Sequence, residues 1–155
     1  MKLKNTILFL VGLLYLTACG GGSSDGEKVD DIDKQKPTIT IIAPASNSSF
    51  NAGSDLTVEI DASDDIELNN YVISIQMSGA KSVKTVEEFS FNSQSDTDKN
   101  GNELPTIKGQ KSVKLDFEIV INEFAEAGVY TLTCTVVDAA GNQEEKETEF
   151  TIERI

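Results

Sequence analysis

The feature that most constrains the fold of this chain is the alternation of apolar and polar residues in short runs after residue 36. Side chains of a β-strand point to opposite faces in turn, so alternation predicts strands with one buried face. Polar turn residues separate the runs. About seven such strands predict an all-β, antiparallel β-sandwich. The predicted strands are residues 38–42, 56–62, 71–77, 83–91, 112–121, 129–137 and 145–152.

Two connections in this pattern differ from ordinary short turns. Residues 92–109 are polar and rich in Asp, Asn and Ser, which predicts a long loop. Residues 122–127 could form one helical turn. Neither segment competes with the strand pattern, so a single sandwich over residues 37–155 remains the expectation.

The amino terminus predicts export. Lys2 and Lys4 precede an apolar run over residues 7–16, the order found in secretory signal peptides. This run is too short for a bilayer, which needs about 20 apolar residues. We therefore expect residues 1–18 to be a signal peptide.

Cys19 changes the expected outcome of cleavage. The sequence Leu16-Thr17-Ala18-Cys19 resembles the bacterial lipobox. The resemblance implies that Cys19 becomes the lipidated first residue of the mature protein and joins it to the membrane. The alternative is an ordinary signal peptide with an incidental cysteine.

Residues 19–36 contain Gly, Ser and charged residues with few apolar ones, which predicts a flexible linker. Acidic residues soon after a lipidated cysteine resemble the surface-export signal of Bacteroidetes-type lipoproteins. This resemblance implies an outer-membrane lipoprotein exposed at the cell surface, with the periplasmic face as the alternative.

The net charge excludes some partners. The chain carries a formal charge of −13, and loss of Lys2 and Lys4 with the signal peptide would make it −15. Nucleic acids are bound largely through Lys and Arg, so we expect no nucleic-acid partner. Electrostatic adhesion to anionic lipids is disfavoured for the same reason.

The residue types also argue against catalysis. The chain has no His and no Trp, and Cys134 is the only cysteine besides Cys19. A nucleophilic cysteine needs a base, usually His, and Cys134 falls at an inward position of the alternating run 129–137. We therefore expect no catalytic residues, no enzyme activity and no disulfide.

A loop over residues 96–102 is the sharpest candidate for metal binding. Asp96, Asp98, Asn100 and Asn102 place oxygen ligands at alternate positions, as in the first half of a calcium loop. An EF-hand would have Glu at its twelfth position, where this chain has Ile107. The prediction is therefore a partial calcium site, because Asp, Asn and Gly also suit an ordinary turn.

Further calcium ligands could come from other turns. In a simple Ig strand order, the turn with Asp64 and Asp65 and the turn that begins at Asp138 would reach the same pole as Asp96 and Asp98. Calcium there would offset the repulsion between carboxylates. No cofactor is required by the sequence, and Ca²⁺ is the only one that it suggests.

Two segments carry a family resemblance. Residues 37–65 are similar to the opening of bacterial Ig-like domains, and residues 128–142 are similar to their penultimate strand and last turn. With the lipobox, the chain resembles Ig-like lipoprotein domains of unknown function from Bacteroidetes. Tyr130 matches the tyrosine corner of such domains, but Leu132 stands where a cysteine would be expected.

The resulting functional hypothesis is a non-catalytic, lipid-anchored binding or assembly module of the cell envelope, with another protein as its partner. One alternative is a glycan-binding accessory lipoprotein of polysaccharide uptake. Glycan sites usually need exposed aromatic rings, whereas Tyr71 and Tyr130 fall on predicted inward faces. The other alternative is a calcium-stiffened structural spacer.

Overall fold

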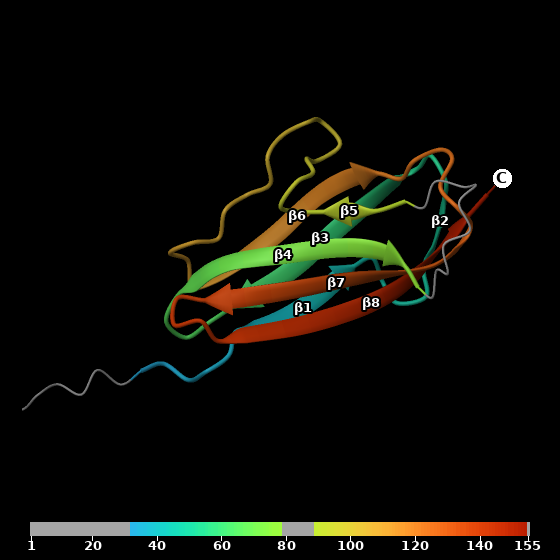
Figure 1. Cartoon of the computed structure of the whole chain (residues 1–155). Coiled ribbons are helices and arrows are strands. Elements are labelled where there is room, and N and C mark those ends of the chain that lie inside the picture. Colours follow the sequence, from blue (N-terminus) through green and yellow to red (C-terminus); the bar gives the residue numbers. More distant parts are fainter. Residues whose placement is uncertain (1–31, 79–88, 155) are drawn as a thin grey trace, which may run out of the picture. The chain divides into compact units, whose positions relative to one another are not determined.

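The computed structural model describes residues 32–78 and 89–154. Their strands form two sheets that pack face to face (Figure 1), which confirms the predicted all-β sandwich. No helix in the described part of the chain is long and apolar enough to cross a membrane. The strands are β1 (Thr38–Ala43), β2 (Ser49–Asn51), β3 (Asp55–Ser63), β4 (Leu68–Met77), β5 (Phe91–Asn92), β6 (Ser112–Val120), β7 (Gly128–Asp138) and β8 (Gln143–Glu153).

The smaller sheet has the order β1-β3-β6, and the larger has the order β2-β8-β7-β4-β5. All pairings are antiparallel except that of β2 with β8, which is parallel. The antiparallel sandwich that the sequence predicts is therefore confirmed, and the parallel strand β2 is an addition to the predicted strands. β2 has only three residues in a Ser- and Asn-rich segment, too few to show alternation. Of the predicted strand 83–91, residues 83–88 lie outside the described part.

The core lies between the inner faces of the two sheets. Buried residues alternate with less buried ones along β3 and β7 and over most of β4 and β6, as the sequence pattern predicted. The register places Ile60 opposite Leu115 in one sheet and Ile73 opposite Cys134 in the other. Phe150 adds a ring from β8 that stacks on Tyr130 with centroids 6.0 Å apart. Burial of this apolar surface is the main force that holds the sheets together.

The tyrosine corner is confirmed. The Tyr130 hydroxyl donates a hydrogen bond to the backbone oxygen of Glu126 at 2.8 Å, which fixes the turn before β7. Leu132, at the position of the expected cysteine, is fully buried.

The predicted helical turn at residues 122–127 is not formed. This segment is a hydrogen-bonded turn, in which the Ala125 amide donates to the Asn122 carbonyl at 2.9 Å. The Asn122 side chain also accepts the Phe124 amide at 2.8 Å, and this local bond competes with helix formation.

The strand directions define two ends of the sandwich. β3 and β7 end, and β4 and β8 begin, at the end that we call the Asp138 pole. The opposite end, where β3 and β7 begin, we call the Asp55 pole. The N-terminal segment joins β1 at the Asp138 pole, and the chain leaves β8 at the Asp55 pole (Figure 1).

Residues 33–36, which the sequence assigned to the linker, contact the sandwich. The Asn142 side chain donates to the backbone oxygen of Asp33 at 3.2 Å, and Lys36 pairs with Glu144 at 3.6 Å. This segment therefore lies against the Asp138 pole before β1 begins.

Candidate functional site

The loop over residues 96–102 satisfies its own polar groups. One oxygen of Asp98 accepts the backbone amides of Asn100 and Asn102, each at 2.8 Å, and the other accepts the Asn102 side chain at 2.9 Å. The hydrogen bond from the Asn102 side chain is the largest of the causes that lower the pKa of Asp98. Asp96 accepts the backbone amide of Asn92 at 2.7 Å. These are the hydrogen bonds of an ordinary turn, in which Asp side chains accept nearby amides of the chain.

This loop does not meet the other predicted ligands. Lys99 pairs with Asp55 at 3.0 Å, and its backbone amide donates to the Glu118 carbonyl at 2.7 Å, which puts the loop beside the Asp55 pole. Asp64 follows the far end of β3. A nine-residue strand is about 30 Å long, so one ion cannot join the two groups. The expectation of a shared pole was wrong because the loop folds back along β6.

Ile107, which occupies the twelfth position of the calcium-loop pattern, is 1% exposed and packs in the core. Asp65 is exposed, and its backbone oxygen accepts the Lys111 ammonium at 2.8 Å. The Asp65 carboxylate is not among the acidic groups that the structure brings together. Cys19 lies outside the described residues, so its lipidation remains a prediction.

Three carboxylates do converge at the Asp138 pole. Asp33, Asp64 and Asp138 each contribute an oxygen atom, and these atoms all lie within 4.8 Å of one another. Asp138 is fully buried and Asp64 is 9% exposed. Asp64 and Asp138 were predicted as ligands, whereas Asp33 was missed. Its only sequence signal was the acidic composition of the predicted linker.

The backbone of two turns holds Asp64 and Asp138 in place. One oxygen of Asp64 accepts the amides of Ile66 and Glu67, each at 2.9 Å. Asp138 accepts the backbone amide and the side-chain amide of Asn142, each at 2.8 Å. The Ala139 amide donates to the Glu67 carbonyl at 2.9 Å, which joins the two turns.

The side chains of Cys134 and Tyr71 are not suited to act as nucleophiles or bases. Burial raises the pKa of the Cys134 thiol to about 12. Burial also raises the pKa of Tyr71 to about 12, and its hydroxyl donates to the Pro105 carbonyl at 3.0 Å. Both groups are therefore protonated at neutral pH. Among the described aromatic residues, Phe124 is the one that is largely exposed, at 58%.

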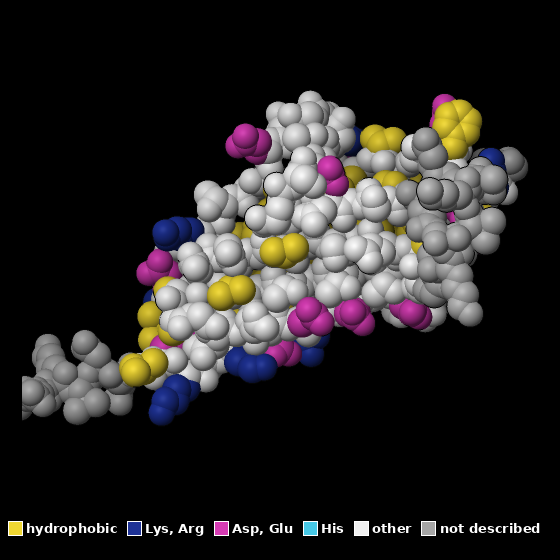
Figure 2. Space-filling model, in the orientation of Figure 1, with side chains coloured by type: hydrophobic (Ala, Val, Ile, Leu, Met, Phe, Trp, Pro, Cys, Tyr) yellow, Lys and Arg dark blue, Asp and Glu magenta, His cyan; other side chains and the backbone are white. Residues whose placement is uncertain are grey.

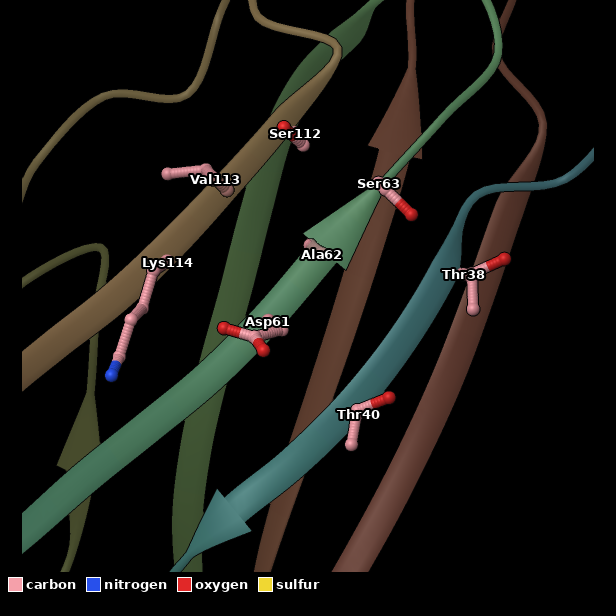
Figure 3. Close-up of a pocket in the computed structure, with 8 residues that line it drawn as sticks. All are labelled: Thr38, Thr40, Asp61, Ala62, Ser63, Ser112, Val113 and Lys114. Carbon is pink, nitrogen blue, oxygen red and sulfur yellow. The ribbon is translucent and has the colours of Figure 1, made fainter.

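The outer faces of both sheets are polar. Over the smaller sheet lies an open depression of about 350 Å³, which residues of β1, β3 and β6 line (Figure 3). Its lining includes Thr40, Asp61, Ser63 and Lys114. On the larger sheet, acidic side chains follow β8 (Figure 2), and Glu145 and Glu147 accept the hydroxyls of the neighbouring β7 threonines.

Comparison with known proteins places the chain in a family. A family described as a domain of unknown function (DUF4625) matches residues 23–153. The chain belongs to this family. The DUF4625 match covers the whole sandwich and begins before the described residues. A search of curated proteins found no significant match.

Solved structures match this chain only at low similarity. The fibronectin(III)-like modules of Clostridium thermocellum CbhA match with 15% identity and a TM-score of 0.44, over 76% of this chain and 47% of theirs. A DUF4466 family protein from Parabacteroides merdae matches with 11% identity and a TM-score of 0.48, over 76% of this chain and 45% of its own. The DUF4625 chain spans less than half of either one. These values are too low to indicate a shared function.

Proposed function

We propose that this DUF4625 protein is a non-catalytic, lipid-anchored interaction module of the outer envelope, and that its ligand is another protein. The observation that carries the proposal is the polar outer face of the smaller sheet together with its two edge strands. Within the described residues, β1 and β6 each pair with β3 alone. The other edge of β1 can offer backbone amides and carbonyls to an added strand, as can the part of β6 away from Glu118, whose carbonyl already accepts the Lys99 amide.

The side chains on this face suit a polar protein surface. Thr38, Thr40 and Ser63 lie to one side of Asp61 and Lys114 lies to the other (Figure 3). Lys114 pairs with Glu59 on the neighbouring strand. These groups offer both donors and acceptors. The described aromatic residues other than Phe124 are buried or, for Phe50, partly buried. The glycan alternative is therefore less well supported, since sugar sites usually stack on exposed rings.

Affinity capture from envelope extracts with the intact chain tests the protein partner. We expect Thr40→Arg, on the proposed face, to abolish recovery of a captured envelope protein. Gln76→Arg is the matched control, because Gln76 is exposed on the larger sheet. Equal capture by both variants would contradict this face. Retention of a glycan on an array, with no protein captured, would replace the protein ligand by a sugar.

The lipid anchor has its own test. We expect metabolic palmitate labelling of the wild-type protein, and loss of the label in Cys19→Ser. Globomycin, which blocks the lipoprotein signal peptidase, should cause the uncleaved form to accumulate. An unlabelled, freely secreted wild-type protein would contradict the anchor while leaving the interaction face untouched.

A further inference from the structure

We propose that Asp33, Asp64 and Asp138 form a Ca²⁺ site that fastens the N-terminal segment to the Asp138 pole. The proposal does not depend on the lipid anchor or on the protein partner. It differs from the calcium loop suggested by the sequence, because Asp96 and Asp98 lie elsewhere in the fold.

The donor set is that of a hard divalent cation. All three groups are carboxylates, which Ca²⁺ and Mg²⁺ prefer over softer ligands. None of the ion pairs among the described residues involves Asp33, Asp64 or Asp138. Up to three negative charges are therefore held close together at the edge of the core, and a bound cation would remove their repulsion.

An orphaned oxygen points to a ligand at this place. Oδ1 of Asp64 accepts two backbone amides. Oδ2 of the same carboxylate is shielded from solvent, because only 9% of Asp64 is exposed. This oxygen has no hydrogen-bond partner. A buried oxygen of this kind destabilises the folded state if it stays unsatisfied. Coordination of a cation by Oδ2 would satisfy it without disturbing the turn.

Ca²⁺ suits this donor set better than Mg²⁺ does. Mg²⁺ demands near-ideal octahedral geometry and usually keeps several waters, whereas Ca²⁺ accepts a flexible arrangement of carboxylates. The three carboxylate oxygens lie within 4.8 Å of one another, which is close enough for them to share one Ca²⁺ ion. Ca²⁺ takes six to eight oxygens, and water can supply the ligands that the three carboxylates leave open.

The site would join three separate segments. Asp64 and Asp138 are fixed by the turns before β4 and β8, whereas Asp33 precedes β1. The Asp33 carboxylate accepts the Gln35 amide at 2.9 Å, and its backbone oxygen accepts the Asn142 side chain at 3.2 Å. A cation would add a bond of much greater strength to this contact. Calcium would thereby fix the position of the N-terminal segment where it enters the domain.

Calorimetric titration of the full chain with CaCl₂ tests the site. We expect one ion per chain, with a dissociation constant of about 10⁻⁴–10⁻³ M, as in extracellular calcium modules. Asp33→Asn and Asp64→Asn should each weaken binding at least about tenfold, since each removes a charged ligand. Calcium should also raise the melting temperature and slow amide exchange at residues 34–36 in the wild type.

Two matched controls remove the same charge outside the cluster. Asp65→Asn changes the exposed neighbour of Asp64, and Asp98→Asn changes the loop beside the Asp55 pole; both should bind calcium as the wild type does. Absence of binding at about 10 mM CaCl₂, well above the range of such modules, would overturn the proposal. Loss of binding in Asp98→Asn but not in Asp33→Asn would also overturn it. A larger melting shift with Mg²⁺ than with Ca²⁺ would overturn the assignment to calcium.

Discussion

Cys134 lies at the middle of β7 with no exposed surface, and the cause of its high pKa is burial alone. The thiolate is the reactive form of cysteine. A thiol that holds its proton to about pH 12 is therefore a small apolar core residue. The same reasoning applies to Tyr71, whose hydroxyl is occupied by the Pro105 carbonyl.

The raised pKa of Cys134 predicts alkaline destabilisation. The unfolded chain loses this proton near pH 9.0 and the folded chain near 12, so the stabilisation is complete below about pH 9 and is lost as pH rises towards 12. We expect the free energy of unfolding to fall by up to about 1.4 kcal/mol per pH unit in that range. Urea unfolding between pH 8 and about 11 measures the slope, which Cys134→Ala should reduce. An unchanged slope in Cys134→Ala would contradict the assignment. Tyr71 adds a slope of the same sign over a narrower range of pH, above 10.0.

The tyrosine corner predicts that loss of the Tyr130 hydroxyl lowers the stability of the fold. Tyr130→Phe removes the hydroxyl that donates to Glu126 while it keeps the ring in the core. We expect a loss of about 1 kcal/mol in the free energy of unfolding, the typical net value for one such hydrogen bond. Val129→Ala, at a half-exposed neighbour, is the control in the same urea titration. A Tyr130→Phe protein as stable as the wild type would show that the corner does not stabilise the turn.

At the scale of elements, the alternation of apolar and polar residues was sufficient to predict the strands that build the core. Residues 56–62 and 129–137 appear in the structure within one residue or so of the predicted ends. β2 could not be predicted, because its three residues gain their strand geometry from pairing with β8. The carboxylate cluster was only partly predicted. Asp64 and Asp138 sit in turns with a clear pattern, but Asp33 reaches them through tertiary contacts that no local pattern encodes.

The turn before β3 contains a glycine that the backbone requires. Gly53 has a φ of 83°, and its amide donates to the Ile121 carbonyl at 3.1 Å. We expect Gly53→Ala to lower the free energy of unfolding by about 1–2 kcal/mol, because a Cβ is disfavoured in this conformation. Gly128→Ala is the comparison: its new Cβ would meet only the flexible end of Met77, which can move aside. Thermal denaturation of both variants measures the difference, and a larger loss in Gly128→Ala would contradict this explanation.

At the scale of the whole molecule, residues 32–155 form a compact unit with a continuous core. We expect a protein of residues 32–155 to unfold in one cooperative transition, because single small domains usually behave so. Calorimetry of both proteins provides the test. Two transitions, or a marked loss of stability in the shorter protein, would show that residues before 32 contribute to the fold.

The described domain begins at the Asp138 pole and ends at the Asp55 pole, so its two termini lie at opposite ends of the strands. A load applied between the termini would therefore run parallel to β1 and β8. The hydrogen bonds that join β1 to β3 and β8 to β7 would have to break together in shear. They could not break one after another from a strand end. A protein arranged in this way resists pulling along its long axis, a useful property for any molecule exposed to flow.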